Sequence, residues 1–297
     1  MANLRDIRRR IKSIKNTAQI TRAMQLVAAS KMKKAQDQAL AGRAYSSHLE
    51  ALLRNLKEEA LTSGHPLLAQ NAGTRELYVV ITTDKGLCGG LNTNLLRKLI
   101  REAPADAKFI TVGNKGRNAL AKMKRDLVAD YQVRDPVHFN EVKQVVKKAV
   151  KMFLDGEVDV VKVAFTNFVN TLVNHPEITR FLPLDPSEVG EKKDYHGMQG
   201  VPDVQGPSAE SYSDYLFEPG RPEVFDQLLP LYVNYLMFQM VLESRAAEHS
   251  SRMVSMKSAT DNAKGIVKEL TLEYNKLRQA AITNELLEIS TAQMAVG

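Results

Sequence analysis

Hydrophobic residues at both ends of the chain recur at alternating steps of three and four positions. From Leu4 to Ala60 this stepping meets 17 positions, of which 13 are apolar when Ala is counted. From Phe225 to Asn284 it meets 18 positions, of which 14 are apolar. A repeat that averages about 3.5 residues is typical of helices that wind around each other. The pattern therefore predicts two long terminal helices with apolar seams that form a coiled coil.

The two seams differ in the size of their side chains. Between Ala18 and Gly42 the N-terminal seam carries mostly small residues, which let a partner backbone approach closely. The C-terminal seam carries bulky residues that would fill the gaps: Met253, Met256, Val267 and Tyr274. Because proline lacks an N–H group, we expect Pro230 to kink the C-terminal helix or to delay its start.

The middle of the chain follows a different pattern. Short runs rich in β-branched residues predict strands at 77–83, 108–112 and 160–166. Amphipathic helical stretches alternate with them at 92–103, 115–124 and 139–154. This alternation favours an α/β domain with a mainly parallel sheet.

The change of pattern suggests five segments along the chain. We expect an N-terminal coiled-coil helix at 1–60, a linker at 61–75 and an α/β domain at 76–185. Residues 186–221 are rich in Gly, Pro, Ser and acidic side chains and predict a loop. The C-terminal coiled-coil helix would then occupy 222–297.

The composition is that of a soluble globular protein, with 44% hydrophobic and 25% charged residues among 297. Cys88 is the single cysteine, which excludes an internal disulfide framework and fits a reducing compartment. No apolar run approaches the roughly 20 residues that span a bilayer. The basic opening is not followed by an apolar stretch, so it is not a secretory signal. We therefore expect a soluble, cytoplasmic chain.

Positive charge is concentrated on the first helix. Residues 1–35 hold ten basic side chains against Asp6 alone, whereas the other residues hold 31 basic and 33 acidic ones. This strip could be a solvated helix face, or it could meet nucleic acid, acidic lipid or an acidic protein surface. A partner is favoured because the uncompensated charges repel one another. Single-stranded nucleic acid is disfavoured because residues 1–35 lack aromatic side chains for stacking.

The segment 84–92, DKGLCGGLN, is the most tempting candidate for a chemical site. A Gly-rich turn between a strand and a helix can cradle phosphate through free N–H groups. The spacings of the nucleotide-binding motifs are absent, however. A tight turn or close packing is therefore favoured for Gly86, Gly89 and Gly90. Cys88 has no nearby histidine and no second cysteine, which favours a small loop or interface residue.

The remaining polar residues do not form a recognisable catalytic or metal-binding pattern. The six histidines are scattered without metal-ligand spacing, and no G-x-S-x-G motif occurs. His249 falls on the predicted C-terminal seam, which favours a packed or register-setting polar residue. The sequence thus predicts no metal, no cofactor and no catalytic residues.

Three segments together resemble the gamma subunits of the bacterial F-type rotary ATP synthases. They are IRRRIKSIKNTAQITRAMQLVAASKMKKAQ at 7–36, TTDKGLCGGLN at 82–92, and the run from Arg252 to Ile289. The resemblance implies a long antiparallel coiled coil, made by the N- and C-terminal helices, that flanks a central Rossmann-like α/β domain. It implies a non-catalytic central-stalk rotor that couples proton flow to ATP synthesis or hydrolysis and regulates the ATPase activity.

The resemblance also implies partners and a location. The coiled coil would enter a hexamer of three alpha and three beta subunits, and the α/β domain would lie against the epsilon subunit and the c-subunit ring. The chain would be a peripheral protein on the cytoplasmic face of the bacterial inner membrane, attached only through the complex. Nucleic acid would not be a partner.

Contact residues follow from the same resemblance. Contacts with the alpha–beta hexamer are expected from Arg8, Arg9, Lys12, Arg22, Met24, Lys31, Lys33, Lys34, Arg278 and Gln279. The end of the chain, 282–297, is expected to run in an apolar sleeve of the hexamer. Contacts with epsilon and the c-ring are expected from Gly86, Leu87, Cys88, Gly89, Gly90, Tyr215, Phe217 and Glu218.

Two other classes of function stay open on the residues alone. The chain could be a coiled-coil scaffold or a tether for nucleic acid that uses its basic arm. It could also be a small α/β enzyme with helical arms, which would bind a phosphate ligand at 86–90.

Overall fold

A computed structural model describes residues 4–62, 64–71, 73–189 and 216–296 of the chain. The chain divides into two compact units. We call Met1–Ala28 with Met253–Gly297 the helical unit, and Ala29–Arg252 the α/β unit.

Two long helices are present, as the hydrophobic repeat predicts, and each contributes to both units. Helix α1 spans Leu4–Asn55 and helix α6 spans Arg221–Val296, and the short helix α2 (Lys57–Thr62) follows α1. The expected delay at Pro230 is wrong, because α6 begins at Arg221 and contains Pro230 in its interior. Buried Leu229 and Val233 on either side of the proline give the helix packing energy that offsets its lost hydrogen bond.

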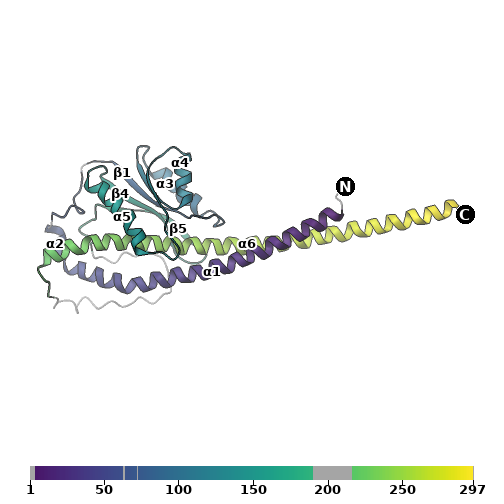
Figure 1. Cartoon of the computed structure of the whole chain (residues 1–297), viewed down its shortest axis with the longest axis horizontal. Coiled ribbons are helices and arrows are strands. Elements are labelled where there is room, and N and C mark those ends of the chain that lie inside the picture. The colour runs from purple at the N-terminus through teal and green to yellow at the C-terminus, as the bar shows by residue number, and fades with distance from the viewer. Residues whose placement is uncertain (1–3, 63, 72, 190–215, 297) are drawn as a thin grey trace. The chain divides into compact units, whose positions relative to one another are not determined.

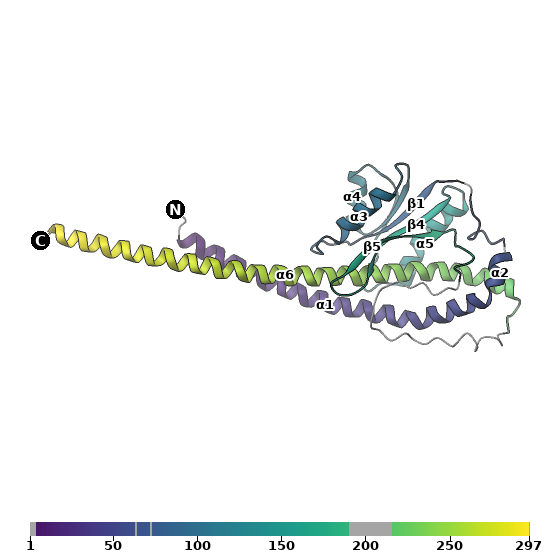
Figure 2. The same ribbon diagram turned by 180° about the vertical axis from the view of Figure 1, so that it is seen from behind.

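In the helical unit, α1 and α6 lie side by side and antiparallel (Figures 1 and 2). The hydroxyl oxygens of Thr21 and Thr260, both on the predicted seams, are 2.7 Å apart. Seam residues Ile7, Ala28, Met256 and Ala263 are buried, while most residues between seam positions are exposed. The prediction of a coiled-coil seam is therefore confirmed in this unit.

Helix α6 of the helical unit continues beyond the residues that pack on α1. With Thr21 opposite Thr260, an antiparallel pair brings Leu4 opposite residues near Leu277. Residues 282–291 are exposed throughout, including the apolar Ile282, Leu286 and Ile289. The end of α6 is thus a single helix with a bare apolar surface.

The α/β unit contains a five-stranded sheet in the order β3-β2-β1-β4-β5. The strands are β1 (Glu76–Ile81), β2 (Lys108–Val112), β3 (Asp126–Tyr131), β4 (Val160–Phe168) and β5 (Asn174–Leu182). All neighbouring strands are parallel except β4 and β5, which are antiparallel. The three predicted strands and the mainly parallel sheet are confirmed, whereas β3 and β5 were not predicted.

Helices cover both faces of this sheet (Figure 1). Side chains alternate between faces along a strand, and β1 shows this clearly. Leu77, Val79 and Ile81 join the core formed with α5 (Phe139–Leu154), α1 and α6. Tyr78 and Val80 join the opposite core with α3 (Leu91–Glu102) and α4 (Asn114–Lys122). The unit is therefore a three-layer α/β domain, in which α6 is buried from Tyr235 to Ser250 apart from the half-buried Phe238.

Candidate functional site

The basic side chains of α1 lie on the surface of the chain. In the helical unit, Arg8, Arg9, Lys12 and Arg22 are exposed and Met24 is half-buried. Residues 1–28 contain seven basic side chains and one acidic, while residues 253–297 contain five of each. The helical unit therefore carries nearly all of the chain's net positive charge, and that charge is on α1 alone.

The other predicted contact residues of the hexamer are also exposed. Arg278 and Gln279 lie on α6 in the helical unit, close to the start of its bare apolar end. Lys33 and Lys34 belong to the α/β unit and are exposed there. Lys31 is exposed as well, but its Nζ lies 2.8 Å from Asp135 Oδ2, so it forms an ion pair within the α/β unit.

The Gly-rich segment 84–92 forms a compact turn between β1 and α3. Asn92 Nδ2 donates to Thr83 Oγ1 at 2.8 Å, and Asn92 Oδ1 accepts from Thr83 N at 3.2 Å. The backbone adopts a left-handed conformation at Gly89 (φ 58°). It does so at Leu87 as well (φ 64°), which is unusual for a residue with a Cβ. Cys88 is 2% exposed and its side chain is turned into the fold. The predicted tight turn is confirmed.

Hydrogen bonds from α6 hold this turn by its carbonyl groups. Ser251 Oγ donates to Cys88 O at 2.7 Å. Arg252 donates from Nε to Gly86 O and from Nη2 to Lys85 O, both at 3.2 Å. A phosphate cradle would present N–H groups to a ligand, whereas this loop presents carbonyls to α6. The contacts support the packing interpretation of the glycines.

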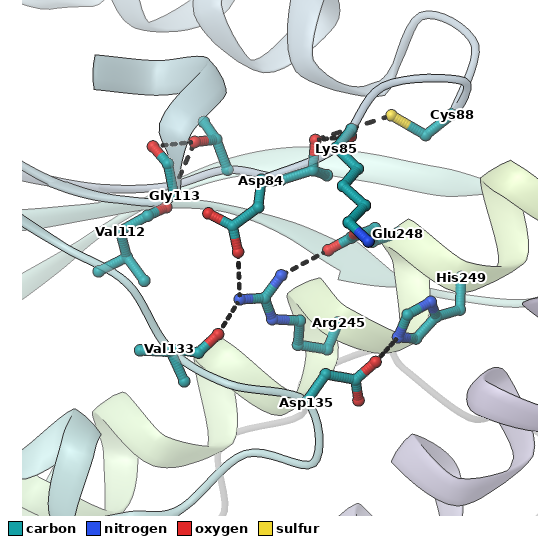
Figure 3. A network of polar contacts seen from close by, with 12 residues as sticks. Asp84, Lys85, Cys88, Val112, Gly113, Val133, Asp135, Arg245, Glu248 and His249 are labelled. Carbon is teal, nitrogen blue, oxygen red and sulfur yellow. Dashed lines mark hydrogen bonds and ion pairs between the residues drawn. The ribbon is translucent and has the colours of Figure 1, made fainter. Parts of the chain in front are cut away.

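A buried arginine lies at the centre of the polar network beneath this loop (Figure 3). Arg245 on α6 is only 5% exposed. Its guanidinium donates to Val133 O at 2.6 Å, to Glu248 Oε2 at 2.7 Å and to Asp84 Oδ2 at 3.3 Å. Burial acts to lower the pKa of Arg245, but the carboxylates of Glu248 and Asp84 outweigh it and raise the pKa. The network joins α6 to the loops that follow β1 and β3, two strands that lie on either side of β2 in the sheet.

Glu248 connects Arg245 with Arg252, the arginine that holds the Gly-rich turn. Its Oε1 accepts from Arg252 Nη2 at 2.8 Å, while its Oε2 accepts from Arg245. Asp84 in turn accepts from the backbone N–H of Asn114 at 3.1 Å. Each charged group is thus paired with an opposite charge, which a buried ionic cluster requires for stability.

A second ion cluster lies beside the first and includes α1. Asp135 Oδ2 is 3.1 Å from His249 Nε2 and 2.8 Å from Lys31 Nζ. The contact with His249, together with the hydrogen bond from Lys31, holds the pKa of Asp135 well below its usual range. His249 is 3% exposed, which confirms the prediction of a packed polar seam residue. This cluster links α1, the loop after β3 and α6 within the α/β unit.

The segment at 215–219 is only partly described. Tyr215 lies outside the described residues. The ring of Phe217 lies 5.4 Å from the guanidinium carbon of Arg221, and Glu218 is exposed. Of the predicted residues in the Gly-rich loop, Leu87, Gly89 and Gly90 are exposed and accessible to a partner.

Two further properties bear on cofactors and membranes. Within the described ranges, no group of three or more His, Cys, Asp or Glu side chains is arranged to hold a metal ion. In that same part of the chain, no helix combines the length and the apolar character needed to cross a bilayer.

Comparison with known proteins places this architecture in a family. A family model described as ATP synthase matches residues 3–296. The ATP synthase gamma chain of Akkermansia muciniphila is 48% identical over 296 residues, which is 100% of both chains. That of Opitutus terrae is 48% identical over 295 residues, or 99% of both chains.

Solved structures show the same fold at lower identity. The rotor of the Euglena gracilis mitochondrial ATP synthase matches with a TM-score of 0.63 and 19% identity, covering 94% of this chain and 98% of that one. The central stalk of the Tetrahymena thermophila mitochondrial enzyme matches with a TM-score of 0.58 and 23% identity, covering 81% and 99%. The fold is thus that of the central-stalk proteins of rotary ATP synthases. The chain belongs to the ATP synthase gamma-chain family.

Proposed function

We propose that this chain is a central-stalk rotor that couples ion flow through a membrane ring to ATP synthesis or hydrolysis in an alpha–beta hexamer. The main support for the proposal is the distribution of charge and apolar surface on the helical unit. It is a coiled coil with its excess positive charge on one helix and a bare apolar end on the other. The gamma chains among its relatives and the rotors and central stalks among similar structures support the same function.

The coiled coil is suited to passing torque to surrounding subunits. Its seam packs two helices along their length, and paired helices resist bending more than a single one. Because Arg8, Arg9, Lys12 and Arg22 lie on one helix only, the electrostatic field around the rod is not uniform. An acidic surface that surrounds the rod would therefore interact differently with each angle of rotation. We assign the exposed basic side chains, with Met24, Arg278 and Gln279, to contacts with the hexamer.

The exposed end of α6 would turn inside an apolar sleeve of the hexamer. Ile282, Leu286, Leu287 and Ile289 are 48%, 62%, 58% and 64% exposed. Contiguous exposed apolar residues of this kind mark an interaction surface. An apolar sleeve would cover them without the directional hydrogen bonds that oppose rotation.

The α/β unit would meet the epsilon subunit and the c-ring. Leu87, Gly89 and Gly90 in the Gly-rich turn are accessible, and Cys88 would take part only through its backbone. The segment at Tyr215–Glu218 belongs to the same proposed surface. The Arg245 and Asp135 clusters would transmit force within the unit because they fasten its loops to α6 and α1.

The proposal includes a non-catalytic role and a location. The chain would house no bond-making residues of its own and would regulate ATPase activity only through its partners. It would bind on the cytoplasmic face of a bacterial inner membrane through the complex. Its polar clusters fit this role because each joins one structural element to another.

Reconstitution with partners tests this function. The chain is mixed with purified alpha and beta subunits, and the ATPase activity of the complex isolated by gel filtration is measured with and without it. We expect co-elution and activity that depends on the chain. Recovery of the chain alone, or with nucleic acid that dissociates steeply as salt rises, would support a scaffold or tether instead.

A further inference from the structure

A cavity of about 350 Å³ opens in the α/β unit beside α5 and α6. Its lining includes Leu67, Val146 and Val233, which are buried side chains and form an apolar floor. Lys143 and Lys147 also line it, and both are exposed. The volume lies within the range of small-molecule sites, roughly 300–1,000 Å³.

The spacing along α5 creates an apolar wall with a cationic rim. Val146, Val150 and Leu154 follow one another at four-residue steps, so they share one face of the helix. Lys143 and Lys147 are also four residues apart and lie next to that face. None of the described residues that line the cavity is acidic. The two ammonium groups are therefore not compensated within the cavity.

The remaining polar groups at the cavity are few and neutral. His65 Nδ1 accepts a hydrogen bond from the N–H of Leu67 at 3.1 Å. Burial lowers the pKa of His65, an effect that Asp226 partly offsets. Asn234 Nδ2 donates a hydrogen bond to Pro230 O at 2.7 Å. The cavity thus offers two cationic groups and an apolar interior, without the dense polar lining that a sugar or a nucleotide base requires.

We propose that this cavity binds one single-chain anionic amphiphile, such as a medium-chain carboxylate. The alkyl chain would pack on Val146, Val150 and Val233. The carboxylate would accept hydrogen bonds from Lys143 and Lys147 at the rim, where water still reaches it. A neutral alkane would leave the ammonium pair unused, and a compact anion would leave the apolar floor uncovered. This proposal does not depend on the rotor function.

Titration calorimetry on the full chain tests the proposal, with decanoate, octanoate and decanol as probes. We expect one saturable site for decanoate. Octanoate should bind roughly tenfold more weakly, because two fewer methylene groups are buried. In Lys143→Gln/Lys147→Gln, decanoate binding should weaken about tenfold while decanol binding stays unchanged. The matched control Lys148→Gln/Lys151→Gln changes two lysines of the same helix that do not line the cavity, and should bind as the unaltered chain does.

A second variant obstructs the cavity from the apolar wall of α5. Val150→Trp should abolish decanoate binding, and circular dichroism establishes that the variant is folded. If that variant does not fold, the Lys143→Gln/Lys147→Gln variant still tests the proposal, because both lysines are exposed. Absence of saturable binding, equal affinity for octanoate and decanoate, or binding unchanged in the Lys143/Lys147 variant would overturn the proposal. Exclusion of decanoate from the assembled complex would also overturn it and would assign the cavity to a segment of a partner.

Discussion

Arg245 Nη2 lies 3.3 Å from Asp84 Oδ2, so the first residue of the Gly-rich segment is joined to a helix 161 positions later in the chain. The same guanidinium bonds Glu248 and the carbonyl of Val133. One buried side chain therefore fastens two loops of the α/β domain to α6. If the chain is a rotor, force that enters through these loops reaches the helix through this contact.

Removing this arginine should destabilise the α/β unit. Arg245→Met leaves the buried Glu248 paired only with Arg252 and leaves Val133 O without its donor. We expect a loss of about 3 kcal/mol in the free energy of unfolding, measured by urea titration. Arg134→Gln is the matched control, because Arg134 pairs with Glu141 at 3.4 Å but its side chain is 84% exposed. The control should lose no more than about 1 kcal/mol. Equal losses of unfolding free energy in Arg245→Met and Arg134→Gln would show that the buried network stabilises the unit no more than an exposed ion pair does.

The hydroxyl pair in the helical unit makes a prediction about its register. Thr21→Val or Thr260→Val removes one partner of the 2.7 Å contact and should cost about 1 kcal/mol. The double variant makes this level of the seam apolar, so its cost should be less than the sum of the two. A double-mutant cycle from denaturant unfolding measures the coupling. Strict additivity would mean that the two threonines do not meet.

The Asp135 cluster predicts a pH dependence of stability at acid pH. Its partners lower the pKa of Asp135 in the folded chain below the value of about 3.9 for an unfolded chain. The stabilisation is therefore fully present above that unfolded value and is lost as pH falls through the lower, folded pKa. Asp135→Asn should be clearly destabilising at pH 6, and the difference from the unaltered chain should shrink below about pH 4. Urea unfolding at both pH values measures it, and a constant difference would contradict the assignment.

Neutralising the exposed basic residues should weaken association without unfolding the helices. Glutamine is a good helix former, so Arg8→Gln/Arg9→Gln/Lys12→Gln should retain the helical circular dichroism. We expect slower association with the alpha–beta hexamer and a weaker dependence of the rate on salt. Lys264→Gln/Lys268→Gln/Lys276→Gln removes the same number of charges from α6 of the same unit. Equal effects of the two triple variants would argue against a special role for the α1 strip.

The hydrophobic repeat predicted the helix pair well because each seam position is defined by packing on one neighbour. It could not predict the Arg245 and Asp135 clusters. Charged residues on a two-helix rod are normally solvated. In these two clusters, Arg245 and His249 are buried only because the sheet covers α6. One signal was present in the sequence: from Leu229 to Leu242 apolar residues occur on more than one face of the helix. A helix that is apolar on several faces is buried by more than one neighbour.

The two strands missed by the sequence pattern are the edges of the sheet. Strand β3 contains Asp126 and Asp130, and β5 contains Pro176 and Glu177. Edge strands contact the core through one face and often carry charge or proline, so their apolar signal is weak. The delay that Pro230 was expected to cause does not occur for a related reason, since packing from distant residues outweighs a local preference.

Single-molecule observation of rotation tests the rotor function most directly. The alpha–beta complex is fixed to a surface, and a bead is attached through Lys122→Cys, an exposed position at the end of α4. The natural Cys88 is buried and need not be replaced. On addition of ATP, we expect the bead to turn in one direction in three equal steps, one for each alpha–beta pair. ATP hydrolysis by the labelled complex without directional rotation would contradict the assignment of this chain as the rotor.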